Sequence, residues 1–212
     1  MLSSPTFKFV TQDICFNNFK TDILILWTSS SLLAGDETFI NVHKEAGSSV
    51  KKEIYNIKYD YKLENFKFGD NVVTNSGILK IDKIIHSVLP NSRIITDKIK
   101  KQNLLTKTLF SIKETIKYFE STNYKILHLT FLPLSGKIYG EVTDKDIELY
   151  LSYICSEFKD FHTITIVFNS EEERKKYLYI FNKKNNSFLK KIKEYVKDFR
   201  VNFKIPRTSS IS

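Results

Sequence analysis

The sequence predicts an α/β protein with three layers, in which helices cover both faces of a mixed, mostly parallel sheet. Short apolar runs alternate along the chain with longer segments in which apolar residues recur at helical spacing. Two of the runs, Asp22–Trp27 and Ile84–Leu89, are almost continuously apolar, which is typical of strands buried on both faces. The chain has 212 residues and is 42% hydrophobic, enough for one core without disulfides or metals.

The first half of the chain predicts five strands and a helix. Residues Thr6–Val10 alternate between apolar and polar types and predict an opening strand, which Asp22–Trp27 follows. Apolar residues that recur at helical spacing predict a helix over about 38–56. Asn71–Ile81 predicts a strand pair interrupted by turn residues at 75–77. Pro90 ends the strand Ile84–Leu89.

The second half continues the alternation. An apolar stripe predicts a helix over about 101–121, and Ile126–Phe131 predicts a strand. Thr143 with Asp146 three residues later forms a capping-box pattern before another amphipathic helix. Thr163–Phe168 is the last predicted strand, and Ser170 precedes three glutamates that suit a helix N-terminus. One further basic helix is expected within residues 182–212, which we separate as a tail from a domain over 1–181.

Ligands of parallel sheets bind beyond the carboxyl ends of the strands. Here those ends lead into the loops 28–38, 89–91, 133–142 and 168–170. In the first and third of these, small polar residues or glycine precede a helix start, where free backbone N–H groups can hold an anion. Facing each other, the two loops are suited to clamp a diphosphate.

The net charge limits which partners are expected, and the cysteine content limits which cellular compartment is expected. The net charge is +9, and nine basic residues against two acidic ones lie between Lys183 and Arg207. This tail predicts either a solvated helix face or contact with RNA or DNA. The two cysteines, Cys15 and Cys155, lack metal-site spacing, so we expect a reducing compartment and no metal. We also expect no cofactor, no membrane span and no signal peptide, and a cytoplasmic location, with the nucleus as the alternative in a eukaryotic or viral protein.

Four stretches of the sequence resemble the macro domain family. Gln12-Asp13-Ile14 resembles the family's Gly-Asp-Ile, and Asp22–Gly47 resembles its long Asn-Ala-Ala-Asn and glycine signature without a gap. Ile84–Pro90 is similar to the family's VIHTVGP, and Thr130–Gly140 to its AFPAISTGVYG. The four agree in order and spacing over about residues 6–181. The resemblance therefore implies a macro-type three-layer fold.

The resemblance also implies a site for ADP-ribose or an ADP-ribosylated protein. Asp13 matches the acid that accepts from the adenine amine, Phe168 the region that flanks adenine, and Tyr139 the aromatic on the terminal ribose. The loop residues that match the phosphate-binding stretches complete the expected set of ligand contacts, with no catalytic residue among them: Ile14, Ser29, Ser30, Ala34, Gly35, Ser135, Gly136, Lys137 and Ile138.

Several positions depart from the family pattern. Where hydrolytic members carry the asparagines and acid that hold the ribose and the attacking water, this chain has Leu26, Ser29 and Phe39. Leucine and phenylalanine neither orient water nor accept a proton. The glycine run is replaced by Ala34-Gly35-Asp36-Glu37, which places two carboxylates where a diphosphate is expected. Lys137 replaces a glycine and either meets a phosphate or blocks the groove.

These matches and departures favour a module that binds ADP-ribose or a related adenine nucleotide without hydrolysing it. A nucleic-acid-binding domain that uses the basic tail is the first alternative, and a divergent ADP-ribosyl hydrolase the second. Each residue also has a structural interpretation. Asp13 is as well suited to cap a strand end, and His43, on the core stripe of its helix, is expected to be a packed structural histidine.

Overall fold

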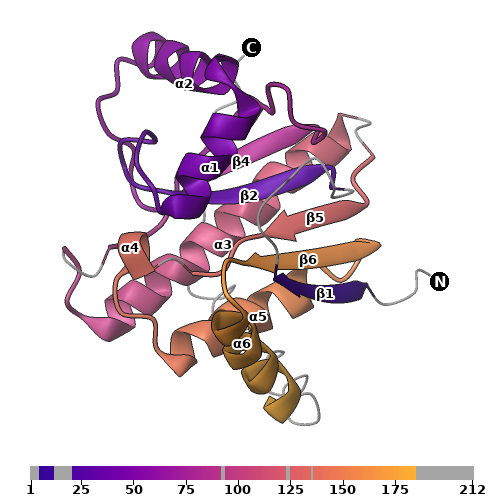
Figure 1. Cartoon of the computed structure of the whole chain (residues 1–212). Coiled ribbons are helices and arrows are strands. Elements are labelled where there is room, and N and C mark those ends of the chain that lie inside the picture. Colours follow the sequence, from indigo (N-terminus) through magenta and orange to yellow (C-terminus); the bar gives the residue numbers. More distant parts are fainter. Residues whose placement is uncertain (1–4, 12–20, 92–93, 123–124, 135, 185–212) are drawn as a thin grey trace.

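A six-stranded sheet forms the centre of the computed structural model, which describes residues 5–11, 21–91, 94–122, 125–134 and 136–184 (Figure 1). The strand order is β1-β6-β5-β2-β4-β3, with β3 antiparallel to β4 and the other neighbours parallel. This confirms the predicted mixed, mostly parallel sheet. The strands are β1 (Thr6–Thr11), β2 (Ile23–Thr28), β3 (Asn71–Asn75), β4 (Lys83–Val88), β5 (His128–Phe131) and β6 (Thr163–Phe168).

Helices cover both faces of this sheet. Those in the described residues are α1 (Glu37–Ala46), α2 (Ser48–Asp60), α3 (Lys98–Ser121), α4 (Gly136–Tyr139), α5 (Asp144–Glu157) and α6 (Glu171–Lys184). Figure 1 shows α1 and α2 on one side and α3 and α5 on the other. The ring of Tyr177 in α6 packs edge-on against Tyr150 of α5, so α6 lies on the α5 side.

Two local predictions were wrong in the same region. The helix expected over 38–56 is divided into α1 and α2 by Gly47, whose φ of 82° lies in a region that L-residues rarely adopt. The strand pair expected over 71–81 is a single strand, β3, followed by a turn at Gly77. A Cβ at Gly77 would lie 1.9 Å from the carbonyl oxygen of Ala46, so this turn packs directly against the end of α1.

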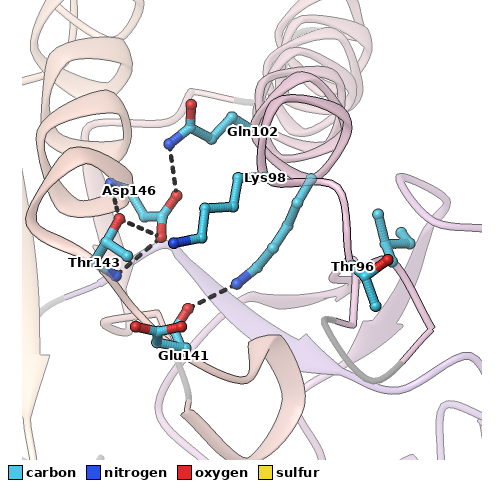
Figure 2. A pocket seen from close by; sticks show the side chains of 8 residues that line it. Thr96, Lys98, Gln102, Glu141, Thr143 and Asp146 are labelled. Atoms are coloured by element: carbon cyan, nitrogen blue, oxygen red, sulfur yellow. Dashed lines mark hydrogen bonds between the residues drawn. The ribbon is translucent and has the colours of Figure 1, made fainter.

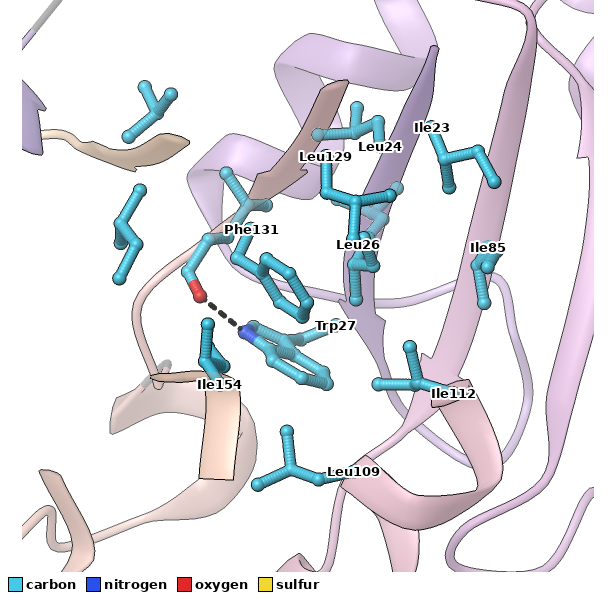
Figure 3. Packing of buried hydrophobic residues seen from close by; sticks show 14 of the residues in the cluster. Ile23, Leu24, Leu26, Trp27, Ile85, Leu109, Ile112, Leu129, Phe131 and Ile154 are labelled. Carbon is cyan, nitrogen blue, oxygen red and sulfur yellow. Dashed lines mark hydrogen bonds between the residues drawn. The ribbon is translucent and has the colours of Figure 1, made fainter. Parts of the chain in front are cut away.

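The central strand β2 anchors the core. All six of its residues are buried, and Trp27 points toward Leu109 and Ile112 of α3 and Ile154 of α5 (Figure 3). The indole N–H of Trp27 donates to the carbonyl of Leu132 over 2.8 Å, and the Tyr150 hydroxyl donates to the same carbonyl over 2.7 Å. A carbonyl oxygen has two lone pairs, so both bonds are satisfied at once.

The start of the loop after β5 is therefore fixed from three sides. Besides the two bonds to Leu132, the backbone N–H of Leu134 donates to the Tyr177 hydroxyl over 2.9 Å. Further along, Thr143 and Asp146 form the predicted capping box of α5. Because these partners come from β2, α5 and α6, the course of this loop depends on the packing of the whole face.

The basic tail lies outside the described residues from Asn185 onward. Contact with RNA or DNA through Lys183–Arg207 therefore stays a prediction, as does the division of the chain into 1–181 and 182–212. Among the described residues, no helix is both long enough and apolar enough to span a bilayer.

Two histidines are held in the core on the α1 side. His86 of β4 is fully buried and shares a 2.9 Å hydrogen bond with the Thr74 hydroxyl, and its ring lies 5.4 Å from that of His43. Burial lowers the pKa of His86 to about 3 and that of His43 to about 4. Both imidazoles are therefore neutral in the folded protein over the physiological range.

We expect the free energy of unfolding to decrease as the pH falls below about 6.5. There the unfolded chain protonates both histidines, whereas the folded chain resists until its lowered pKa values are reached, so acid favours unfolding. For His86 the slope reaches about 1.4 kcal/mol per pH unit, and the partly buried His43 adds less. Urea unfolding of the wild type and His43→Gln between pH 7.5 and 4.5 tests this. An equal pH slope in both proteins would contradict a role for His43.

Candidate functional site

The candidate site lies at the carboxyl edge of the sheet. Because β2 pairs with β5 and β5 with β6, all in parallel, the loops after these three strands emerge side by side (Figure 1). Ser29–Gly35 and Gly136–Tyr139 thus follow neighbouring strands at this edge, and their joint role in binding a ligand stays a prediction. Asp13, Ile14 and Ser135 lie outside the described residues.

The loop after β2 is closed on itself by hydrogen bonds. The N–H of Ser29 donates to the carbonyl of Ala34 over 2.9 Å, and the N–H of Leu32 donates to the carbonyl of Ser29 over 2.9 Å. Leu32 adopts a positive φ of 60°, which the turn requires. Lys58 Nζ donates to the Ser31 carbonyl over 3.1 Å, which joins the loop to the end of α2. The loop is thus held in one conformation, with the side chain of Ala34 exposed.

The N-terminus of α1 carries its own carboxylate. Asp36 is the N-cap, and its side chain accepts the backbone N–H of Phe39 over 2.9 Å. A carboxylate here is favoured by the helix dipole, and it takes an amide that an incoming phosphate would otherwise use. Glu37 is exposed in the first turn of the same helix.

Phe39 packs against the loop that follows β2. Its ring is nearly buried and stacks on the ring of His43, with centroids 4.1 Å apart. A Cβ at Gly35 would lie 2.3 Å from Cβ and Cγ of Phe39, so the glycine is needed for this close approach. Phe39 therefore fills the space beneath the loop that follows β2.

The loop after β5 forms the short helix α4, which the sequence predicted only as a loop. Gly136 and Lys137 are exposed, and Ile138 is buried. Tyr139 is fully buried: the Lys101 ammonium lies 3.7 Å from its ring centre, and its hydroxyl donates to Asp146 over 3.1 Å. The expected contact between Tyr139 and a ribose therefore requires the ring to leave these partners, and it stays a prediction.

The loop after β6 approaches α1. The Asn169 side-chain amide donates to the Thr38 hydroxyl over 2.6 Å. Phe168 itself is fully buried between Phe9 and Tyr177. Its ring stacks on that of Phe9, with centroids 6.2 Å apart, and meets that of Tyr177 edge-on, with centroids 5.0 Å apart. Its expected place beside adenine stays a prediction, whereas the exposed Asn169 directly after it is a polar group at the edge that the sequence analysis missed.

Two carboxylates, Asp36 and Glu173, repel each other at this edge of the sheet. Burial, with repulsion from Asp36, raises the pKa of Glu173 in the first turn of α6 to about 7. Among the described residues, no cluster of three or more His, Cys, Asp or Glu side chains is arranged to hold a metal ion.

A polar cavity of about 270 Å³ lies at the same edge, on the α3 and α5 side. Figure 2 shows Thr96, which precedes α3, together with Lys98 and Gln102 at the start of that helix. On the other side of the cavity are Glu141, Thr143 and Asp146. The sequence analysis singled out Thr143 and Asp146 as helix caps and missed Lys101 and Gln102, which lie in a helix stripe with no motif around them.

The architecture was compared with known proteins. No model of a known protein family and no curated protein matches the sequence. Among solved structures, the Oceanobacillus iheyensis macrodomain with ADP is 20% identical with a TM-score of 0.72, over 86% of this chain and 93% of that one. The chain has the macrodomain fold.

Other solved macrodomains agree with this fold. A point mutant of the Oceanobacillus iheyensis macrodomain with ADPR is 19% identical, with a TM-score of 0.73 over 86% of this chain and 95% of that one. The Trypanosoma brucei macrodomain in complex with ADP is 14% identical, with a TM-score of 0.60 over 83% and 69% of the two chains. The macrodomain fold is thus shared although more than four aligned residues in five differ.

Within this macrodomain fold, the three departures noted in the sequence have structural explanations. Leu26 is fully buried in β2, and Phe39 is held by Gly35 and His43. The Ser29 hydroxyl lies 2.9 Å from that of Ser31. Two of the three positions are therefore part of the hydrophobic core.

We expect Gly35→Ala to destabilise the protein by about 1–3 kcal/mol, because the added methyl group displaces Phe39 from its stack on His43. Gly136→Ala is the control, since a Cβ there meets nothing within 4 Å. Chemical unfolding of both variants provides the comparison. In a Phe39→Gly background, which removes the Cβ as well as the ring, the cost of Gly35→Ala should shrink, and an undiminished cost would contradict the packing described.

Proposed function

We propose that this chain binds ADP-ribose or a related adenine nucleotide at the carboxyl edge of its sheet and does not hydrolyse it. One observation carries the proposal: the parallel pairing of β2 with β5 places the loop 29–36 beside the turn 136–140. Solved macrodomains with ADP or ADPR share this architecture. Two adjoining loops that begin at strand ends and lead into helices suit a diphosphate.

Each part of the ligand has a proposed partner. The backbone of Ser29–Gly35 and of Gly136–Ile138 holds the diphosphate, and the exposed ammonium of Lys137 offsets the nearby carboxylates. Asp13 and the end of β6 receive the adenine. An acceptor beside an apolar surface suits adenine, whose stacking contributes about 1–3 kcal/mol.

The absence of hydrolysis follows from the side chains beneath the loop. Hydrolysis requires a group that orients water or accepts its proton. Leu26 and Phe39 are apolar and buried, so neither supplies such a group. The nucleotide is therefore bound as a signal or a tag rather than as a substrate.

We expect calorimetry to detect ADP-ribose binding to the wild-type chain, and Asp36→Asn to strengthen it roughly fivefold. Asparagine retains the helix cap but removes a negative charge worth about 1 kcal/mol of repulsion. Asp60→Asn, an exposed change at the end of α2, controls for net charge. If millimolar ADP-ribose produces no heat of binding and no thermal shift, the binding function is refuted.

We expect no release of ADP-ribose when the chain is incubated with an ADP-ribosylated protein, because no side chain at Leu26 or Phe39 activates water. The measurement is the amount of free ADP-ribose formed over hours. The variant Gly136→Glu, which adds a negative charge to the turn, shows whether any release depends on this site. Release by the wild type that Gly136→Glu abolishes would instead establish the hydrolase alternative.

A further inference from the structure

The turn that α4 forms is held from beneath by a buried polar network. Lys101 of α3 is 6% exposed, and Asp146 of α5 is 3% exposed. Charged side chains are seldom buried to this degree without partners. Both have partners on the segment 139–143, directly after the residues proposed to hold the diphosphate.

Lys101 holds the segment at two points. Its ammonium lies over the Tyr139 ring, 3.7 Å from the centre, and donates to the carbonyl of Glu141 over 2.7 Å. A cation over an aromatic face gains more when both groups are shielded from water, as they are here. Burial lowers the pKa of Lys101, and Asp146 and Glu141 oppose this by stabilising the charge.

Asp146 holds the same segment at two further points. It accepts the Tyr139 hydroxyl over 3.1 Å and the backbone N–H of Thr143 over 2.9 Å. Gln102 donates to it over 3.1 Å from α3, as Figure 2 shows. Although burial alone would raise the pKa of Asp146, hydrogen bonds from Thr143, Gln102 and Tyr139 hold it below its usual value, so the carboxylate stays charged.

We propose that Lys101 and Asp146 are positioning residues, which fix the α4 turn for ligand binding by clamping Tyr139 inside the fold. This inference rests on the proposed function. In it, Tyr139 acts through the turn and does not touch the ligand. The turn then offers a nucleotide its backbone at 136–138, while the terminal ribose of ADP-ribose gains nothing from the Tyr139 ring.

The clamp can be distinguished from a ribose contact by comparing two ligands. ADP lacks the terminal ribose, so loss of a ribose contact would weaken ADP-ribose binding more than ADP binding. Loss of a clamp moves the backbone that both ligands share, and weakens both equally. The ratio of the two dissociation constants therefore reports which role Tyr139 has.

The experiment measures both dissociation constants by calorimetry for the wild type, Lys101→Met, Asp146→Asn and Tyr139→Phe. We expect each variant to weaken the binding of ADP and of ADP-ribose by the same factor, about tenfold, because each removes one partner from a buried network. Lys100→Met is the matched control, because this lysine is exposed on the same helix, and its constants should not change.

A second measurement, which needs no ligand, tests the clamp in case a variant loses stability. Backbone hydrogen exchange of the unliganded proteins should be faster at residues 136–143 in Lys101→Met than in Lys100→Met, and unchanged in β2 and β4. Unchanged affinities and exchange in folded variants would overturn the clamp, as would a selective loss of ADP-ribose affinity. If the wild type binds neither ligand, the proposed function itself fails.

Discussion

The carbonyl of Leu132 is the point on which the candidate site depends. It accepts one hydrogen bond from Trp27 in the middle of the sheet and another from Tyr150 in α5. Each bond is worth only about 1 kcal/mol. Their effect is geometric, because they fix where the chain leaves β5 and thus the place of the α4 turn beside the loop after β2. A polar group that is buried and doubly satisfied permits few alternative conformations.

The turn after β5 is consequently supported at both ends by side chains that belong to other elements. Trp27, Tyr150 and Tyr177 hold residues 132–134, and Lys101 and Asp146 hold residues 139–143. A ligand-binding loop supported in this way loses little entropy when a ligand arrives, which favours affinity. The loop after β2 is also held in place, but by its own hydrogen bonds and by the packing of Phe39 on Gly35.

The sequence predicted the fold because the strands of a parallel sheet are nearly continuous in apolar residues and the helices carry clear stripes. It failed at Gly47, where the apolar period continues across a break that only the backbone angle reveals. The partners of Tyr139 were beyond sequence analysis, because Lys101 lies far from it along the chain in an ordinary helix stripe. Asp146 was recognised as a cap, but its bond to Tyr139 depends on how two helices meet. The burial of Phe168 against Tyr177 likewise depends on tertiary packing.

Binding without turnover, at the edge where β2 and β5 end, is the central claim about this chain. Hydrogen exchange of the whole chain with and without ADP-ribose measures it most directly, because each segment reports its own protection. The account predicts slower exchange in residues 29–39 and 136–140 on addition of the ligand, with ADP-ribose recovered intact. Protection confined to the basic tail after residue 184, or none anywhere, would contradict it.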